Sequence, residues 1–407
     1  MNEPIAILLA GGSGTRFAPF VSDKIIWPFM GAPFVSCLLK SLIESKIKSI
    51  IVVTNNNNHE FFKCLNIQGV SVTCIPQGED NGMSAALYSI RSQISGRPIL
   101  VLNADDYVET NLIKSILSKI KKTNPKTLLV GLKRSEDLPV GYLKVQNEKV
   151  VSMVEKPPSG QRPSDLVKLT ADYFSNSDDI FTHLDSTPKA PGSDSHYEDA
   201  LIKLLAEKQA DYLSYEGLWF KLKYPHYVID VMELFQKVNI KSFVHRKAFI
   251  HKNAIIEDDV YIDEGARIEP GAIIKSGSYI GRNVIIGNNA LVRQSFVEEG
   301  SVIGYGSEIA RSYVGPKCQV HHSFVGDSVL EGGNNMSWGT VTANLRIDGK
   351  EVLLRHPNGT KVPSGRHKLG AMIGQNAFLG INCSTMPGVC IAASTKVMPG
   401  TIVKDTV

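Results

Sequence analysis

The sequence has no long apolar run, no cysteine pair at metal-binding spacing and no strong excess of one charge. A membrane span needs about 20 consecutive apolar residues, and no segment of this chain approaches that length. Lysine and arginine number 44 against 40 acidic residues, which is too balanced to indicate a nucleic-acid or membrane partner. The chain enters an apolar run at Ile5 without a charged leader, so we expect no secretory signal and a cytoplasmic location.

Cysteine is scarce as well, with six residues in a chain of 407. None forms a CxxC pair or a zinc-ligand spacing, which excludes the common zinc modules. In a reducing compartment we expect all of them to be small, buried apolar residues; they are Cys37, Cys64, Cys74, Cys318, Cys383 and Cys390. The length allows two or three domains with cores of their own.

Short apolar runs alternate with amphipathic stretches over residues 1–225. This alternation predicts βαβ units and an α/β domain with a Rossmann-like mixed sheet, whose ligands bind beyond the carboxyl ends of the strands. The expected strands are Ile5–Leu9, Ser49–Thr54, Val70–Ile75, Ile99–Asn103 and Thr127–Gly131. The expected helices are Val35–Lys46, Ser84–Ile94 and Leu112–Lys121.

The first apolar run passes directly into a glycine-rich turn, Ala10–Arg16 (AGGSGTR). Glycines allow backbone N–H groups to approach an anion closely, and the guanidinium of Arg16 suits phosphate oxygens. Lys24 adds a second positive charge. No GK[ST] follows and no third glycine opens a helix, so this is neither a P-loop nor a Rossmann fingerprint. The segment suits a triphosphate, although an ordinary glycine-rich turn is the alternative.

Two further strand ends carry polar residues that suit a ligand. Asp105 and Asp106 follow Ile99–Asn103, where a carboxylate can hold Mg²⁺ or serve as a turn or helix-capping residue. Gln77 and Gly82 follow the third expected strand. The amide of Gln77 can pair with a pyrimidine edge, and the alternative is a polar loop.

From residue 248 to residue 407 the rhythm changes to a strict period of six. Aliphatic residues recur from Ile250 to Val292 without a slip, each followed four residues later by Ala, Ser or Val until the larger Phe296, and the phase shifts at Val297. This pattern predicts a parallel β-helix with an aliphatic interior. The period is absent from residues 327–368, which we expect to interrupt the coils. Residues 226–247 link the two halves, and the spacing of Pro225–Asn239 predicts a connecting helix.

The segment GGSGTR, with Lys24 four residues before Pro28, resembles the signature of sugar-1-phosphate nucleotidylyltransferases. The resemblance implies that Arg16 and Lys24 are catalytic and that Asp105 binds Mg²⁺. It also implies a nucleotide-binding set of Gly11, Gly12, Ser13, Gly14, Thr15, Gln77 and Gly82. The implied sugar-phosphate-binding set is Gly141, Glu155 and Lys156.

The chain departs from that pattern at several positions. The Asn-Ala-Gly sugar loop falls on Thr170-Ala171-Asp172, so the sugar contacts are changed. Lys221 stands where the family has its second metal carboxylate, two residues after Trp219. A cation at this place would repel a metal ion or occupy its charge position.

Three segments in and around the interruption, Val320–Asp327, Asn334–Arg346 and Pro363–Gly370, closely resemble archaeal-type bifunctional sugar-1-phosphate nucleotidylyltransferase/acetyltransferases. The resemblance implies a left-handed β-helix that trimerises. It also implies three acetyl-transfer residues, His321, Asn344 and Lys350. Phe324 and Leu353 replace a tyrosine and a second lysine of that family, and the basic turn at Arg366 would bind a phosphate or simply be solvated.

Together these features predict a bifunctional enzyme of nucleotide-sugar biosynthesis. Its expected substrates are a nucleoside triphosphate, with UTP or dTTP favoured, a sugar 1-phosphate and acetyl-CoA. The expected assembly is a homotrimer or a dimer of trimers. Because of Lys221, the alternatives are a pseudoenzyme that binds nucleotide sugar without turnover and a protein with acetyltransferase activity alone.

Overall fold

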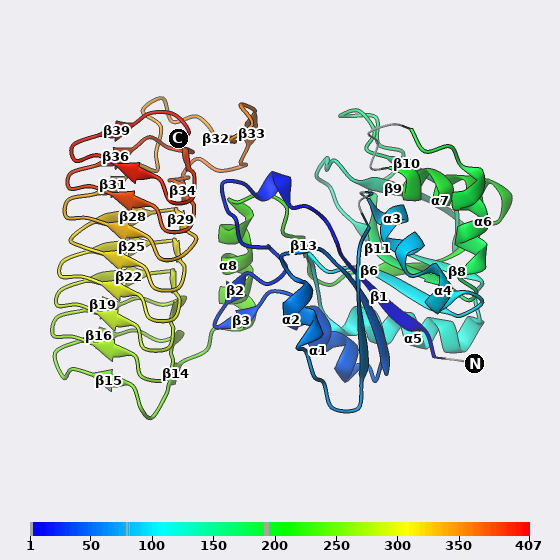
Figure 1. Ribbon diagram of the computed structural model, residues 1–407, viewed down its shortest axis with the longest axis horizontal. Helices are drawn as coiled ribbons and strands as arrows, with labels where there is room; N and C mark the ends of the chain where they lie inside the picture. The colour runs from blue at the N-terminus through cyan, green and yellow to red at the C-terminus, as the bar shows by residue number, and fades with distance from the viewer. Residues whose placement is uncertain (1–2, 79, 81, 191–194) are drawn as a thin grey trace. The chain divides into compact units, whose positions relative to one another are not determined.

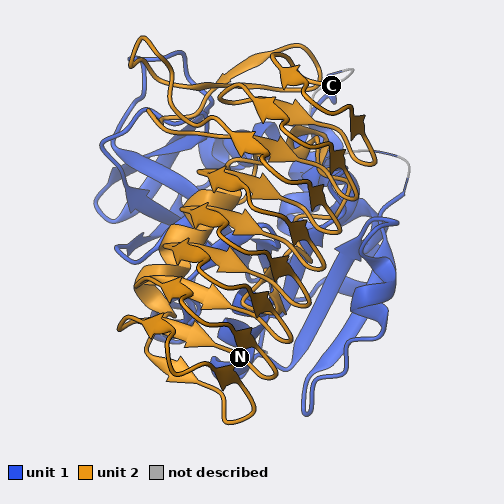
Figure 2. Cartoon of the chain, turned by 90° about the vertical axis from the view of Figure 1, so that its left-hand side faces the viewer, with its two compact units in different colours: residues 1–13, 35–221 blue, residues 14–34, 222–407 orange. Residues whose placement is uncertain are grey.

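The computed structural model describes residues 3–78, 80, 82–190 and 195–407 (Figure 1). The chain forms two compact units (Figure 2): residues 1–13 with 35–221, here the α/β unit, and residues 14–34 with 222–407, here the β-helix unit. The chain therefore passes from the α/β unit to the β-helix unit at Gly14, within the glycine-rich turn, and returns to the α/β unit at Val35. The sequence predicts domains over 1–225, 226–247 and 248–407. That division does not assign segment 14–34 to the β-helix, and it stays a prediction.

The α/β unit is built on a mixed nine-stranded sheet in the order β5-β4-β1-β6-β11-β8-β12-β10-β9. Its strands are β1 (Ile5–Ala10), β4 (Ser49–Thr54), β5 (Ser71–Pro76), β6 (Ile99–Asn103), β8 (Thr127–Lys133), β9 (Gly141–Gln146), β10 (Lys149–Glu155), β11 (Leu166–Phe174) and β12 (Ala210–Tyr215). β1 pairs in parallel with β4 and β6, whereas β11 runs antiparallel to β6 and β8. The predicted α/β fold with a mixed sheet is confirmed.

The described helices of this unit are α1 (Ser36–Glu44), α2 (His59–Lys63), α3 (Met83–Ser89), α4 (Arg91–Ile94), α5 (Thr110–Thr123), α6 (Asp178–Ser186) and α7 (His196–Glu207). The helices predicted over 35–46 and 112–121 are α1 and α5, and both bury an apolar stripe. The predicted helix 84–94 is broken at Ile90 into α3 and α4. A short antiparallel ribbon, β7 (Asp106–Val108) with β13 (Trp219–Lys221), stands outside the main sheet.

The position of β1 explains why its end is the centre of this unit. Ile5, Ala6, Ile7 and Leu8 are almost fully buried because strands on both sides and helices on both faces cover them. β4, β1 and β6 are parallel neighbours, so their carboxyl ends meet at one edge of the sheet. The glycine-rich turn after Ala10 begins at this edge.

The β-helix unit consists of three parallel eight-stranded sheets, wound coil on coil (Figure 1). One sheet contains β14 (Phe243–Val244), β17 (Val260–Ile262), β20 (Ser278–Ile280), β23 (Phe296–Val297), β26 (Tyr313–Val314), β29 (Val329–Leu330), β34 (Met372–Ile373) and β37 (Cys390–Ile391). The second contains β15 (Phe249–Ile250), β18 (Arg267–Ile268), β21 (Ile285–Ile286), β24 (Val302–Ile303), β27 (Gln319–Val320), β30 (Asn335–Met336), β35 (Phe378–Leu379) and β38 (Lys396–Val397). The third contains β16 (Ile255–Ile256), β19 (Ile273–Ile274), β22 (Leu291–Arg293), β25 (Glu308–Ala310), β28 (Phe324–Gly326), β31 (Val341–Thr342), β36 (Ser384–Thr385) and β39 (Ile402–Val403).

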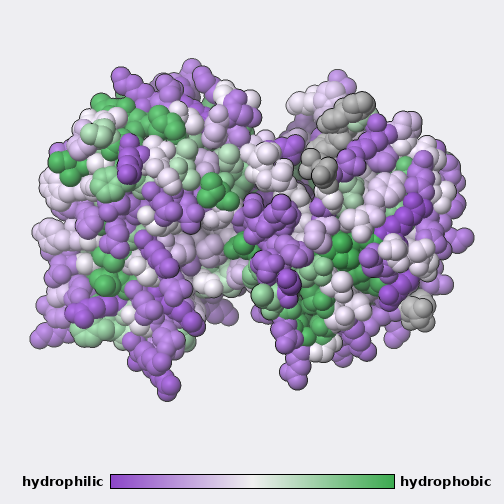
Figure 3. Space-filling view, in the orientation of Figure 1, coloured by the Kyte–Doolittle hydropathy of each residue, from purple (hydrophilic) through white to green (hydrophobic). Residues whose placement is uncertain are grey.

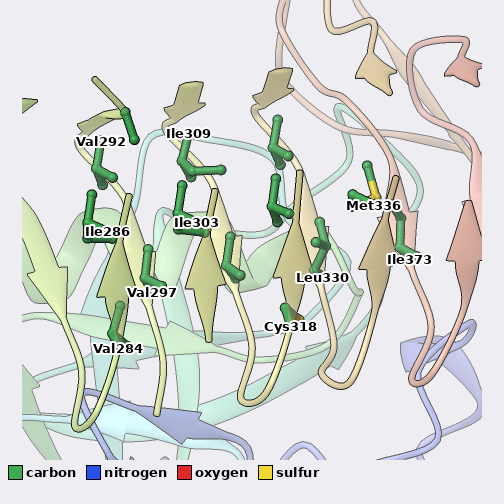
Figure 4. Packing of buried hydrophobic residues seen from close by; sticks show 14 of the residues in the cluster. Val284, Ile286, Val292, Val297, Ile303, Ile309, Cys318, Leu330, Met336 and Ile373 are labelled. Carbon is green, nitrogen blue, oxygen red and sulfur yellow. The ribbon is translucent and has the colours of Figure 1, made fainter. Parts of the chain in front are cut away.

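The six-residue period places its aliphatic residues in the interior, as predicted for a left-handed β-helix. Ile286, Ile303 and Met336 are fully buried, and their neighbours stack above and below them (Figure 4). The pairing Phe243–Tyr261–Tyr279 corresponds to 18 residues per coil, and the next pairing of Tyr279 with Phe296 to 17. This shortened coil is the phase slip seen in the sequence.

The predicted interruption over 327–368 begins too early. The coil continues through β29, β30 and β31, and the chain leaves it only after Thr342 and rejoins it at Met372. The excursion carries one hairpin, β32 (Leu353–Arg355) with β33 (Lys361–Pro363). Sequence periodicity misses the coil because polar residues take part in its packing: Ser328 donates to Gly326 O at 2.7 Å, and Thr342 Oγ1 accepts from Gly326 N at 2.9 Å.

Segment 14–34 folds onto the β-helix through two buried carboxylates. It contains the short helix η1 (Thr15–Phe17) and the strands β2 (Pro28–Phe29) and β3 (Ala32–Pro33). Glu331 Oε1 accepts hydrogen bonds from the backbone N–H groups of Val21 and Ser22 at 3.0 and 2.7 Å. Glu298 accepts from Met30 and Gly31 at 2.9 and 3.0 Å. The β-helix therefore supplies acceptors for backbone donors that a free loop would leave to water.

Aromatic side chains complete this anchorage. Trp27 is almost fully buried and packs on Tyr313 of β26 with ring centroids 5.5 Å apart. Phe29 packs on Phe235 of α8 (Tyr227–Val238), the helix that lies within the predicted stretch 225–239. Tyr313 also donates its hydroxyl hydrogen to Pro28 O at 2.7 Å. Segment 14–34 is thus part of the hydrophobic packing of the β-helix unit.

Glu298 makes the stability of this anchorage depend on pH. Burial raises the pKa of Glu298 from 4.5 to about 7, against the opposing effect of the two N–H donors. Between pH 4.5 and about 7 the Glu298 carboxyl is protonated in the folded protein and ionised in the unfolded chain. The free energy of unfolding therefore falls as pH rises through this range and does not change further above it. The expected loss is about 3 kcal/mol. In Glu298→Gln this component should disappear, which thermal unfolding of both proteins at pH 5 and pH 8 will measure; an equal pH dependence in the two would contradict it.

The prediction for cysteine holds in part. All six are free thiols, and Cys318, Cys383 and Cys390 are buried in the β-helix. Cys37 and Cys74 are only half-buried, and Cys64 is exposed at the end of α2, so burial was wrongly predicted for these three. In the described part of the chain, no helix is both long and apolar enough to cross a membrane.

Candidate functional site

The glycine-rich turn at the end of β1 is held by two asparagines that sequence reasoning missed. Asn58 donates to Ala10 O at 2.9 Å, and Asn55 donates to Gly12 O at 2.9 Å. Both follow the end of β4, in the run of four asparagines at residues 55–58. That run was the available signal. These two side-chain amides hold the backbone carbonyl groups of the turn and so stabilise its conformation.

The side chain of Gln77 lies against this turn, and its predicted role in nucleotide binding stays a prediction. A Cβ atom built on Gly11 would lie 1.9 Å from Gln77 Oε1 and 2.9 Å from Gln77 Cβ, so any larger residue there would force the Gln77 side chain to move. Gln77 Nε2 donates to the backbone oxygen of Asp80 at 2.8 Å, which orients the amide. Gly82 has a φ of +97°, a conformation that favours glycine. Glu79 and Asn81 of the same loop lie outside the described residues.

Asp105 and Asp106 lie at the end of β6, next to Lys221. The ammonium nitrogen of Lys221 is 3.4 Å from Asp105 Oδ1 and 3.5 Å from Asp106 Oδ1. Burial alone would lower the pKa of Lys221, but the charges of the two aspartates outweigh it and raise this pKa well above its usual value. Lys221 therefore carries its positive charge at any physiological pH.

These residues do not fit a divalent cation at Asp105. At about 4 Å and an effective dielectric constant of about 20, a divalent ion and an ammonium repel each other by about 8 kcal/mol. Among the described residues there is also no group of three or more His, Cys, Asp or Glu side chains that could hold a metal ion. Mg²⁺ at Asp105 stays a prediction, which this arrangement of charges does not support.

The three predicted sugar-phosphate residues lie together at one end of β9 and β10. Glu155 pairs with Gly141 across the two strands, and a Cβ on Gly141 would lie 2.7 Å from Glu155 Oε2. Lys156 Nζ is 3.5 Å from Glu155 Oε1. A side chain at position 141 would force the Glu155 carboxylate to move, and Glu155 and Lys156 place one negative and one positive group side by side. Their role in binding stays a prediction.

The altered sugar loop has a structural explanation at Asp172. This aspartate is fully buried and accepts from Lys168 Nζ and from the Tyr197 hydroxyl, both at 2.7 Å. Near it, burial raises the pKa of Glu198 to about 7, and the charge of Glu155 acts in the same direction. Lys168 and Glu198 are polar groups of this region that no sequence motif indicated.

The two predicted catalytic cations of the nucleotide site belong to the β-helix unit. Arg16 lies in η1 and Lys24 in the turn before β2, within segment 14–34 that Glu298 and Glu331 anchor. Gly14, with a φ of +66°, caps η1, and Thr15 begins it. Gly11, Gly12 and Ser13 belong to the α/β unit. The roles of all these residues stay predictions.

The predicted acetyl-transfer histidine, His321, is exposed in the turn between β27 and β28. The adjacent His322 has a φ of +42°, and its ring lies between those of Tyr305 and Trp338, with centroid distances of 5.8 and 5.1 Å. Both histidines lie outside the strands, in the corner between β27 and β28. The two rings nevertheless have different environments, since only His322 is stacked.

Asn344, the predicted acceptor-binding residue, is oriented by a buried carboxylate that sequence reasoning did not identify. Its side-chain amide donates to Asp327, which also accepts two bonds of 2.7 Å from Arg311. Asn344 lies beside Gly326, where a Cβ would come within 2.8 Å of Asn344 Nδ2 and 2.6 Å of Phe324 Cε1. Phe324, where the resemblance places the family's tyrosine, lies against Gly326 and offers no hydroxyl group.

The remaining predicted residues of this half lie on the excursion that follows β31. Lys350 donates its backbone N–H to Asp348 at 3.2 Å, and its role stays a prediction. Leu353 begins β32. Arg366 is neither solvated nor placed for a phosphate: its guanidinium binds Asp230 and Glu233 of α8, the latter at 2.8 Å. That ion pair ties the excursion to the helix.

Comparison with known proteins gives both halves of the chain a match. Residues 5–221 match the nucleotidyl transferase family, and residues 256–353 match the GMPPB C-terminal domain family. A bifunctional sugar-1-phosphate nucleotidylyltransferase/acetyltransferase of Sulfurisphaera tokodaii is 30% identical over 99% of this chain and 98% of its own length. The bifunctional protein GlmU of Methanococcus vannielii is 29% identical over 96% of this chain and 92% of its own.

Solved structures resemble the first half of the chain in fold. UDP-glucose pyrophosphorylase complexed with UDP-glucose superposes with a TM-score of 0.51 at 19% identity, over 58% of this chain and 99% of that one. An apo UDP-glucose pyrophosphorylase gives a TM-score of 0.52 at 18% identity, over 58% of this chain and 99% of that one.

Proposed function

Because this chain belongs to the family of bifunctional sugar-1-phosphate nucleotidylyltransferase/acetyltransferases, we propose that it carries both activities of that family in nucleotide-sugar biosynthesis. The first half transfers a nucleotidyl group from a nucleoside triphosphate to a sugar 1-phosphate and releases pyrophosphate. The second transfers an acetyl group from acetyl-CoA to the amine of an amino sugar phosphate. The similarity to a bifunctional relative over 99% of the chain is the observation that carries this proposal.

Nucleotidyl transfer requires alignment and charge neutralisation. An oxygen of the sugar phosphate attacks the α-phosphorus, and the bond to the pyrophosphate leaving group breaks. The backbone of the glycine-rich turn, Arg16 and Lys24 hold the triphosphate, and Lys156 holds the phosphate of the sugar. Gln77 beside Gly11 supports a pyrimidine base, hence UTP or dTTP. The family generally implies a divalent cation, but Lys221 already lies 3.4 Å from Asp105 Oδ1.

Acetyl transfer requires a base for the amine and an oriented acceptor. A neutral His321 takes the proton as the amine attacks the thioester carbonyl, and the thiolate of CoA leaves. Asn344, fixed by Asp327 and Arg311, orients the amino sugar. The exposure of His321 is compatible with access for both substrates.

Self-association and location complete the proposal. A single coil edge offers few walls for CoA, which favours a homotrimer or a dimer of trimers. Large apolar residues exposed on the last coils support this, and Figure 3 shows hydrophobic surface there; they include Phe378, Ile381, Met398 and Ile402. We place the enzyme in the cytoplasm, where these substrates are made.

Replacing Arg16 by alanine should lower kcat/KM for nucleotidyl transfer by roughly 30- to 1,000-fold, corresponding to about 2–4 kcal/mol of lost transition-state stabilisation. The guanidinium follows the glycine-rich turn directly, so its loss removes two phosphate hydrogen bonds. Pyrophosphate release will measure this, with the exposed Arg246→Ala of the same unit as control. Activity of Arg16→Ala within twofold of wild type, or a wild type that binds no nucleotide in calorimetry, would contradict the assignment.

A further inference from the structure

The backbone fixes Lys221 opposite the acidic strand end. In the ribbon of β7 and β13, Lys221 pairs with Asp106, and Trp219 pairs with Val108 two positions away. The indole N–H of Trp219 donates to Asp106 Oδ2 at 3.2 Å. Strand pairing places the backbone of Lys221 opposite Asp106, and the hydrogen bond from Trp219 holds the Asp106 carboxylate in the same ribbon. The ribbon itself therefore brings the Lys221 ammonium to the two aspartates.

The burial of the aspartates makes a nearby cation necessary. The side chains of Asp105 and Asp106 are only 12% and 7% exposed, and that of Lys221 is 31% exposed. Two carboxylates that lose most of their water need an adjacent positive charge to stay ionised together. Lys221 supplies that charge from within the protein, at the strand end where parallel α/β sheets bind their ligands.

We propose that the Lys221 ammonium takes the place of a divalent cation at Asp105, so that the nucleoside triphosphate binds without a metal ion coordinated by this aspartate. The inference rests on the proposed nucleotidyl transfer by the same site. A metal ion brought to Asp105 would have to displace the lysine, because the ammonium already lies 3.4 Å from Asp105 Oδ1 and the two positive charges repel each other.

Mn²⁺ alone tests this on the full-length protein, without nucleotide. By electron paramagnetic resonance, wild type should bind no Mn²⁺ below about 1 mM, whereas Lys221→Asp should bind at least tenfold more tightly, since three carboxylates then converge. The exposed Lys133→Asp, which makes the same charge change elsewhere in the unit, should behave like wild type. A stoichiometric Mn²⁺ site in wild type that Asp105→Asn removes would overturn the proposal.

A second measurement keeps the test decisive where Lys221→Asp does not fold. The affinity of wild type for UTP in calorimetry should change less than threefold between EDTA and 5 mM Mg²⁺, and Asp105→Asn should leave the effect of Mg²⁺ unaltered. A gain above tenfold with Mg²⁺ that is lost in Asp105→Asn would overturn the proposal. A wild type that binds no nucleotide in either buffer refutes nucleotidyl transfer instead, while the Mn²⁺ titration still reports on Lys221.

Discussion

Replacing His321 by alanine should lower the rate of acetyl transfer by roughly 10²–10⁴-fold, the usual contribution of a general base. Nucleotidyl transfer should be unchanged, because its residues lie in other parts of the chain. The loss should shrink at high pH, where the amine of the acceptor deprotonates without help. Thiol release from acetyl-CoA and pyrophosphate release, both measured on the same preparation across pH, will test these expectations.

His322→Ala is the matched control, since it removes the same kind of side chain one position away. Its ring is stacked between Tyr305 and Trp338, so we expect a small change in stability and little effect on acetyl transfer. Equal losses in the two variants, or a pH-independent loss in His321→Ala, would mean that His321 is a surface residue of a scaffold.

Replacing Glu331 by alanine should lower the affinity for nucleotide at least tenfold and spare acetyl transfer. The carboxylate accepts from the backbone N–H groups of Val21, Ser22 and Gln375, the last at 2.7 Å. Its loss leaves three donors without an acceptor, at a cost of about 2–4 kcal/mol. The stretch around Val21 and Ser22, between Arg16 and Lys24, should then come away from the β-helix, while Glu298 and the buried Trp27 still hold the rest of segment 14–34. Calorimetry with UTP and thermal unfolding will measure both effects.

Glu331→Gln is the matched control, because it removes the negative charge of Glu331 but keeps an oxygen that can accept the hydrogen bonds from segment 14–34. Its amide oxygen can still accept from Val21 and Ser22, whereas its NH₂ group cannot accept from Gln375. We therefore expect nucleotide affinity close to wild type with a smaller loss of stability. If Glu331→Ala binds nucleotide as well as wild type, the anchorage of segment 14–34 has no functional role.

Much of the fold could be predicted because local pattern and tertiary burial agree. β4 and β6 have the predicted bounds, since both are apolar runs buried on two faces of the sheet. The six-residue period led directly to the β-helix, because each interior position is filled by the coil's own aliphatic residue. The coil of β29, β30 and β31 was missed where buried hydroxyl groups, such as that of Thr342, take part in the packing through hydrogen bonds.

The predicted site was limited by contacts between residues far apart in sequence. Motifs pointed to Gln77 and Asn344, but no motif assigned a role to Asn58, which binds the glycine-rich turn, or to Asp327, which binds Asn344. The anchorage of segment 14–34 joins residues about 300 positions apart: Val21 and Glu331 are separated by 310. Nothing in a local pattern encodes such a pairing.

One measurement tests the central claim, that a single chain carries both activities. Purified protein is screened with each nucleoside triphosphate against a panel of sugar 1-phosphates for pyrophosphate release, with thiol release from acetyl-CoA followed in parallel on amino sugar phosphates. The account predicts pyrophosphate with UTP or dTTP and at least one sugar 1-phosphate, and thiol release with at least one amino sugar phosphate. Thiol release without pyrophosphate in any combination, or neither product, would contradict it.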